Sequence, residues 1–253
     1  MSRAATLEEL EAEPTLRHLA WHAAMVLAAN NKLENRGLVW GEQEEGQIQG
    51  DPEASAWFGV GLHRDVRQLD AEVSVGGGFA RFGNDDGYVC GPPEFVFPAV
   101  TRFEERIKVR CGVQLQREKT EIFSWGVVPA GAPVQMRRAG EQVEGGFEPG
   151  FLCYGIPVGS PGYCRYMLNQ KAVEVVKAVE DVCRVLGEEK QSLWLVLHRS
   201  LQHKRDYHLA LCYPSDIVPT AAYLDNIMWG VMERCVDQKI PRREEGAGFE
   251  CVQ

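Results

Sequence analysis

Several features that mark common classes of protein are absent from this sequence. No apolar run approaches the ~18 residues that a membrane-spanning helix needs, and the acidic stretch MSRAATLEELEAEP at the N-terminus lacks the apolar segment of a secretory signal. The eight cysteines form no C-x-x-C pair, which argues against a zinc ribbon or a disulfide framework and favours reduced, mostly buried thiols. We therefore expect a soluble, intracellular protein that does not associate with membranes.

The sequence also lacks an excess of positive charge. Its formal net charge is −9; residues 1–150 carry 15 Lys and Arg against 23 Asp and Glu, and residues 151–253 carry 12 against 13. A protein that grips a phosphate backbone usually has a basic surface, so the composition counts against nucleic-acid binding. The stretch LHRSLQHKR, residues 197–205, is locally basic, but Asp206 and Glu188–Glu189 lie close to it and favour a solvated helix face.

Hydrophobic spacing predicts helices mixed with short strands. Helical spacing covers residues 14–29, 52–69, 96–107, 164–186, 190–211 and 216–237, and strand candidates occupy residues 38–40, 79–82, 88–90, 113–115 and 122–125. Residues 126–150 are rich in Gly and Pro, which is typical of a connector or a loose hairpin. The expected fold class is therefore α/β (α+β), in which a mixed sheet with helices is followed by a helical part.

Two adjacent carboxylates, Asp85 and Asp86, lie between short apolar runs in RFGNDDGYVCGPP, residues 81–93. The flanking runs predict a β-hairpin with a four-residue turn at Asn84–Gly87. Asn-Asp-Asp-Gly is good turn sequence, so a solvated turn explains the pair on its own. Carboxylate oxygens are also the ligands that Mg²⁺ prefers, and a two-metal phosphoryl-transfer site can be built on such a hairpin. The stretch by itself leaves both interpretations open.

Four segments, in order along the chain, resemble the motifs of reverse transcriptases. EEGQIQGDPEASAWF, residues 44–58, resembles motif B, in which a glycine, two residues and Gln-Gly precede a helix. RFGNDDGYVCGPP resembles motif C, the aspartate-pair hairpin. GVQLQREKTEIF, residues 112–123, resembles the next segment, where a strand leads to Lys-Thr, and FLCYGIPVG, residues 151–159, resembles the Gly-Ile-Pro turn between palm and thumb in non-LTR elements. Four matches in this order are far more specific than any one.

The resemblance implies an RNA-directed DNA polymerase that performs two-metal nucleotidyl transfer with Mg²⁺ or Mn²⁺, on an RNA template and a DNA primer, with dNTP as substrate. It implies that Asp85 is a metal ligand, that Asp86 is its partner carboxylate, and that Lys119 approaches the triphosphate. The residues implied to line the nucleotide and template pocket are Gly46, Gln49, Gly50 and Asp51. Without the resemblance, Lys119 is explained nearly as well as an exposed lysine at the end of a strand. Gln49 is then explained as a polar residue near a helix cap.

The sequence departs from the family pattern at several positions. Gly83 stands where an aromatic residue usually precedes the aspartate pair, and Ala54-Ser55 replaces the usual Ser-Pro of motif B. The first aspartate in the chain is Asp51, so residues 1–50 offer no candidate for the family's first catalytic aspartate, which precedes motif B. Because that carboxylate is needed to hold two metal ions in the usual way, we expect this chain alone to be inactive as a polymerase. We interpret it as the C-terminal part of a reverse-transcriptase-like protein, from a truncated gene or a relic of a mobile element.

The expected domains are an N-terminal helical segment at 1–37, a partial palm-like domain with a ferredoxin-like core at 38–159, a helical thumb-like subdomain at 160–240 and a tail at 241–253. Two alternatives stay open. One is a non-catalytic module with a polymerase-like fold that binds nucleic acid or a protein. The other is an unrelated α/β protein in which the aspartates only make a turn, and finding Gln49, Asp85 and Lys119 around one cleft would exclude it.

Overall fold

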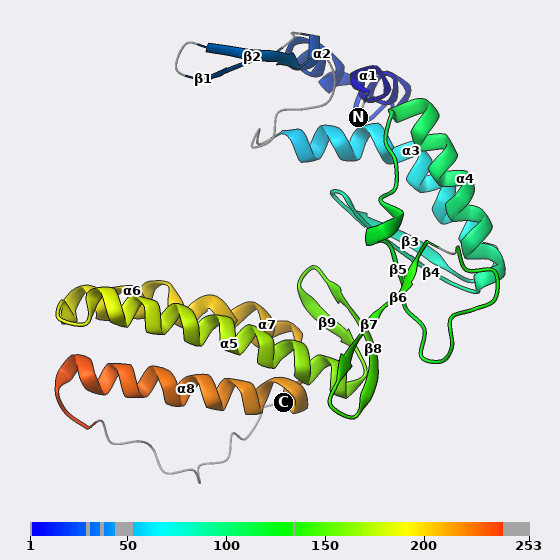
Figure 1. Cartoon of the computed structure of the whole chain (residues 1–253). Coiled ribbons are helices and arrows are strands. Elements are labelled where there is room, and N and C mark those ends of the chain that lie inside the picture. Colours follow the sequence, from blue (N-terminus) through cyan, green and yellow to red (C-terminus); the bar gives the residue numbers. More distant parts are fainter. Residues whose placement is uncertain (1, 29–30, 36–37, 44–52, 134, 240–253) are drawn as a thin grey trace. The chain divides into compact units, whose positions relative to one another are not determined.

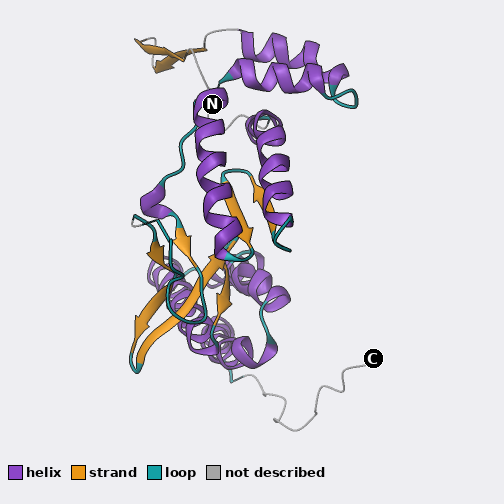
Figure 2. Cartoon of the chain, turned by 90° about the vertical axis from the view of Figure 1, so that its right-hand side faces the viewer, coloured by secondary structure: helices purple, strands orange, loops and turns teal. Residues whose placement is uncertain are grey.

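The structure, a computed structural model, describes residues 2–28, 31–35, 38–43, 53–133 and 135–239. This part of the chain is a mixed α+β protein that is mostly helical, with its strands in small sheets (Figure 1; Figure 2). The chain forms two compact units, Met1–Ile122 with Gly126–Arg137, and Phe123–Trp125 with Arg138–Gln253. Among the described residues, none of the helices combines the length and apolar character needed to span a bilayer.

The first unit combines helices with two-stranded sheets. Its elements are α1 (Arg3–Ala12), α2 (Ala20–Ala28), β1 (Asn31–Asn35), β2 (Leu38–Gln43), α3 (Ala54–Ser74), β3 (Phe79–Gly83), β4 (Asp86–Cys90), α4 (Pro93–Cys111) and β5 (Glu121–Ile122), with 3₁₀ turns η1 (Arg17–Leu19) and η2 (Arg117–Lys119). Strand β6 (Arg137–Arg138) pairs with β5 at the end of this unit. β1 with β2, and β3 with β4, form antiparallel hairpins.

The core of the first unit lies among α1, α3, α4 and the β3–β4 hairpin. α4 buries one residue per turn on a single face, at Ala99, Phe103, Ile107 and Cys111. This spacing of four residues is the helical period that the sequence shows. The hairpin adds the buried Ala80 and the partly buried Phe82, whose ring lies 5.5 Å from that of Phe103. The hairpin is therefore fixed to the helices by side chains from one of its faces.

Ion pairs also join α3 to α4. Arg110 Nε donates to Asp65 Oδ2 at 2.8 Å, Arg106 Nη1 to Glu72 Oε1 at 2.7 Å, and Arg102 Nε to Glu72 Oε2 at 2.9 Å. Partial burial raises the pKa of Glu72, but the hydrogen bond from Arg102 and the charge of Arg106 outweigh burial and leave this pKa below its ordinary value. The carboxylate is therefore ionised, and it holds the two helices in register.

The second unit consists of a three-stranded antiparallel sheet and a group of helices. Its elements are β7 (Gly140–Val143), β8 (Gly146–Cys153), β9 (Ile156–Gly159), α5 (Pro161–Leu186), α6 (Lys190–Arg199), the 3₁₀ turn η3 (Leu201–Arg205), α7 (Asp206–Leu211) and α8 (Pro214–Val236). Its helical core is formed by Val179, Leu193, Leu197, Leu201 and Val231. α5 starts at the cap Ser160, whose Oγ accepts from the N–H of Tyr163 at 3.1 Å.

The β8–β9 hairpin closes with a two-residue turn at Tyr154-Gly155, within the segment that resembles a Gly-Ile-Pro turn. Tyr154 and Gly155 have φ values of 50° and 82°, and positive φ at both central residues is what a type I′ turn requires. In the middle of β8, a Cβ on Gly150 would lie 2.1 Å from Cδ1 of the buried Tyr163. Glycine is needed here because the first turn of α5 packs directly on the strand.

Several predicted elements are confirmed with shifted ends. Helices are present at 54–74, 93–111, 161–186 and 214–236, and strands at 38–43, 79–83 and 86–90. The helix expected over residues 14–29 forms only from Ala20, after a 3₁₀ turn, and α1 was not predicted. The continuous helix expected at 190–211 is wrong, because Ser200, with φ −131° and ψ −63°, leaves helical geometry and separates α6 from η3 and α7.

The predicted strand at 113–115 is also wrong. Val113 and Leu115 have no partner strand among the described residues and instead pack their side chains against the core of the first unit. The strand expected at 122–125 shortens to β5. Residues 126–150, expected as a connector or loose hairpin, include β6, β7 and the start of β8.

The expected mixed sheet is not formed by the described strands, which lie in separate two- and three-stranded sheets. A palm-like sheet needs a further strand that pairs with the β3–β4 hairpin, and no other described strand does so. The N–H of Ala80 on β3 donates instead to the carboxylate of Asp70 on α3. The expected palm-to-thumb boundary at residues 159–160 lies within the second unit. The assignment of palm-like and thumb-like parts stays a prediction.

Candidate functional site

The aspartate pair lies at the tip of the β3–β4 hairpin. Gly83 pairs with Asp86, so the turn consists of Asn84 and Asp85 alone, and the four-residue turn that we expected is wrong. Asn84 has φ 56°, and a positive φ at the first central residue is common to the two-residue turns that match strand twist. Asn adopts this left-handed conformation more readily than most residues, which explains why the tighter turn forms here.

Strand alternation determines where the two carboxylates point. Phe82 and Val89 face the core of the first unit, so Asp86, three residues before Val89, points to the opposite face with Tyr88. Both Asp85 and Asp86 are exposed. The hairpin therefore has one face packed on the helices and presents adjacent carboxylates to solvent at its end.

Asp70 of α3 anchors this hairpin from the side. Its Oδ1 accepts the N–H of Ala80 at 2.8 Å and pairs with Arg81 Nη1 at 3.0 Å. The hydrogen bond from Ala80, reinforced by the charge of Arg81, lowers the pKa of Asp70. The sequence does not reveal the role of Asp70, because helical periodicity does not distinguish an exposed aspartate from one that binds a strand ten residues later.

Lys119 ends the short η2 turn and is exposed. The turn is held to α4 by Arg117, whose Nε donates to Glu104 Oε2 at 3.0 Å. In the described part of the chain, no hydrogen bond or ion pair links Lys119 to Asp85 or Asp86. The predicted triphosphate contact of Lys119 thus stays a prediction.

The four residues expected to line the nucleotide and template pocket, Gly46, Gln49, Gly50 and Asp51, lie outside the described residues. The helix that follows them, α3, is described from Ala54 and reaches Asp70 and the hairpin. The structure therefore connects the motif B helix to the motif C hairpin through Asp70, and the expected pocket residues stay a prediction.

The donor set at the hairpin fits a magnesium ion only in part. Among the described residues, no group of three or more His, Cys, Asp or Glu side chains is placed to hold a metal ion. Asp85 and Asp86 supply carboxylate oxygens, and Mg²⁺ is commonly held by one or two carboxylates together with substrate phosphates and water. The pair therefore suits a metal ion that arrives with a triphosphate better than a permanently bound ion.

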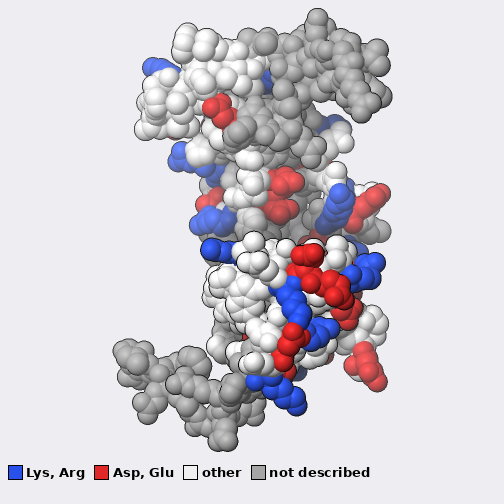
Figure 3. All heavy atoms as spheres, turned by 90° about the vertical axis from the view of Figure 1, so that its left-hand side faces the viewer, with Lys and Arg blue, Asp and Glu red and all other residues white. Residues whose placement is uncertain are grey.

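Among the described side chains of the second unit, the basic stretch at residues 197–205 is interspersed with apolar residues and lies next to acidic ones. Leu197 and Leu201 are buried in the core, while His203 pairs with Asp206 at 2.7 Å. Figure 3 shows Lys and Arg side chains interspersed with Asp and Glu among the described residues on the face drawn. This arrangement favours the solvated-face interpretation of residues 197–205 over a nucleic-acid contact.

Comparison with known proteins found no matching protein-family model, no similar curated protein and no similar solved structure. The functional interpretation therefore depends on the motifs and on the geometry of the hairpin.

Proposed function

We propose that this chain contributes the palm-like and thumb-like parts of a reverse-transcriptase-like protein, whose family reaction is two-metal nucleotidyl transfer. The observation that carries the proposal is the hairpin tip, where the exposed Asp85 of the two-residue turn is followed directly by the exposed Asp86 at the start of β4. The same hairpin is bound to the helix that follows the motif B segment, through Asp70. Asp70 itself lies beyond the motif B segment, which ends at Phe58. The proposal of a common site therefore rests on the order of the motifs in the sequence together with this contact between helix and hairpin.

The proposed roles follow from the position of each group. Asp85 and Asp86 would hold one divalent cation together with the phosphates of a dNTP, and a bound cation would stabilise charge on the reacting oxygens. A second ion needs the family's first catalytic aspartate, for which residues 1–50 offer no candidate, so this chain alone is expected to be inactive. Lys119 neutralises charge on the triphosphate, and Gly46, Gln49, Gly50 and Asp51 line the nucleotide and template pocket. Asp70 is a positioning residue, because it fixes the strand that carries the turn.

The proposal is tested by metal binding at the hairpin in the presence of nucleotide. Mn²⁺ with dTTP is titrated into the isotope-labelled chain, and paramagnetic broadening of backbone amide signals is followed by NMR. We expect broadening centred on residues 84–88, and its loss in the double variant D85N/D86N. The matched control is Glu105→Gln, which removes one exposed carboxylate from α4 and should leave the broadening unchanged.

Binding of an RNA–DNA primer-template, measured by fluorescence anisotropy, separates the proposal from the alternative. Loss of both metal broadening and dTTP binding in D85N/D86N supports the nucleotidyl-transfer site. Absence of Mn²⁺ broadening at the hairpin in the unaltered chain overturns it. If the primer-template still binds in that case, the non-catalytic nucleic-acid-binding alternative is supported.

A further inference from the structure

A small cavity lies in the second unit, among α5, α8 and the segment formed by η3 and α7. Its volume is about 150 Å³. Its apolar wall consists of Leu168, Ala172, Val175, Ile217 and Leu224. An engineered protein cavity of about this size, lined by aliphatic and aromatic groups, accepts benzene. The space therefore suits a compact apolar body of a few carbon atoms.

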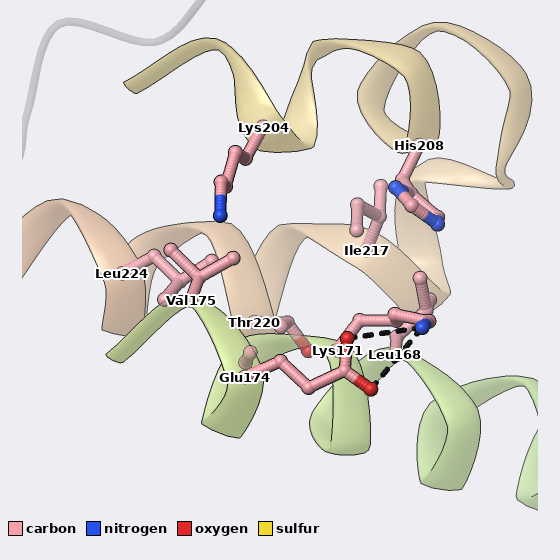
Figure 4. A pocket seen from close by; sticks show the side chains of 10 residues that line it. Leu168, Lys171, Glu174, Val175, Lys204, His208, Ile217, Thr220 and Leu224 are labelled. Carbon is pink, nitrogen blue, oxygen red and sulfur yellow. Dashed lines mark hydrogen bonds and ion pairs between the residues drawn. The ribbon is translucent and has the colours of Figure 1, made fainter. Parts of the chain in front are cut away.

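Polar groups gather at one side of this cavity. Figure 4 shows Lys204 and His208 reaching toward it from η3 and α7, and Lys171 and Glu174 lying on α5 across from them. Lys171 Nζ pairs with Glu174 Oε2 at 3.0 Å, so these two charges largely cancel. Lys204 makes no ion pair with another described residue. The lining thus carries a net positive charge.

The second unit also buries a polar atom that lacks a partner. The Nε2 atom of His208 is inaccessible to solvent and has no hydrogen-bond partner among the described residues. Since this atom is inaccessible even to water, it does not open onto the cavity, and no carboxylate oxygen can approach it from there. The hydroxyl of Thr220, also in the lining, already donates to Asn169 Oδ1 at 3.0 Å. Lys204 is therefore the donor available to a ligand.

We propose that this cavity binds a small organic monocarboxylate. The apolar wall takes the body of the ligand, and Lys204 binds the carboxylate and neutralises its charge. An anion is favoured over a cation because Lys204 is the charge without a described counterpart. This site is separate from the hairpin of the first unit and does not depend on the proposed nucleotidyl transfer.

Benzoate is the probe, because its ring matches the cavity volume and its carboxylate matches the ammonium group of Lys204. The full chain is titrated with benzoate, benzyl alcohol and benzylamine while backbone amide shifts are followed by NMR. We expect benzoate to bind with a Kd of about 1–10 mM, typical of so small a ligand, with shifts at Leu168, Ala172 and Leu224. Benzyl alcohol should bind at least several-fold more weakly, and benzylamine should not bind.

Two substitutions test which polar side chain binds the ligand. His208→Phe keeps a ring but removes a nitrogen that the cavity does not reach, and should leave benzoate binding unchanged. Lys204→Gln alters an exposed side chain, so it should fold normally, and should weaken binding about threefold. Lys177→Gln, at an exposed position on α5, removes the same charge elsewhere and should have no effect.

Three results would overturn the proposal. The first is the absence of amide shifts with benzoate at 50 mM, about five times the weakest expected Kd, which would mean that the cavity holds water only. Equal binding of benzoate and benzyl alcohol would show that the cavity selects for an apolar body alone. Equal affinities of the Lys204→Gln and Lys177→Gln variants would remove Lys204 from the site.

Discussion

At the scale of single residues, Asn84 determines whether the hairpin tip can form. Its φ of 56° is strained for most side chains, and a β-branched residue tolerates it least. Asn84→Val should lower the free energy of unfolding by about 1–2 kcal/mol, measured by urea denaturation. Asn84→Gly relieves the strain and should stay within about 0.5 kcal/mol of the unaltered protein. Equal losses in the two variants would mean that the turn has another conformation.

Cysteine reactivity tests the packing of α4. The described cysteines are all free thiols, but only Cys111 and Cys164 are buried and Cys90 is exposed, so the expectation of mostly buried thiols is wrong. Burial raises the pKa of Cys111 to about 11. Since the thiolate is the reactive form, iodoacetamide at pH 8 should alkylate Cys90 long before Cys111, as read by mass spectrometry.

In urea, where the core is lost, the two cysteines should react at similar rates, which provides the control. Comparable rates for Cys90 and Cys111 in the folded protein would show that the buried face of α4 is wrongly assigned.

At the scale of elements, the hairpin depends on α3 through Asp70. Because the folded-state pKa of Asp70 lies below its unfolded value of about 3.9, the ionised carboxylate stabilises the fold at higher pH, and this contribution is lost as the pH falls through the folded-state pKa. Asp70→Asn should therefore lower the urea midpoint at pH 7. Its difference from the unaltered protein should shrink below about pH 4.

Glu105→Gln is the control for this measurement, since Glu105 is exposed on α4 and its loss should not change the midpoint. A midpoint difference for Asp70→Asn that is constant from pH 7 to pH 3 would exclude a role for the carboxylate charge. The loss of stability would then come from the hydrogen-bond geometry of the side chain alone.

The sequence predicts elements well where packing repeats locally and poorly where it does not. α4 was found because Phe103 and Ile107 recur at the helical period and Gly112, with φ 64°, ends the helix. The strand at 113–115 was wrong because its apolar residues pack on the core without a partner strand.

The candidate site shows the same limit. The aspartate pair and its hairpin could be read from the chain, since turn chemistry and alternation are local properties. Asp70, which fixes the hairpin, could not, because its bond to Ala80 depends on how α3 and β3 pack together. The cavity of the second unit could not be predicted for the same reason, because its lining comes from three separate segments of the sequence, on α5, on η3 with α7, and on α8.

At the scale of the whole molecule, the two compact units have separate cores, and this predicts separate responses to core substitutions. Phe103 is 1% exposed in the first unit, and Leu197 is 3% exposed in the second. Phe103→Ala should cost about 3–5 kcal/mol and Leu197→Ala about 2–5 kcal/mol, each within its own unit. Hydrogen exchange read by mass spectrometry reports the opening free energy of each helix.

With Phe103→Ala, exchange should accelerate in α3 and α4 and stay unchanged in α5 and α8, and Leu197→Ala should give the reverse pattern. Because ligand binding stabilises only the unit that contains the site, Mn²⁺ with dTTP should then slow exchange in the first unit and benzoate in the second. If either substitution instead accelerates exchange in both units equally, the chain unfolds as one cooperative body. The hairpin and the cavity would then share one folding equilibrium, and a ligand at either site would stabilise both.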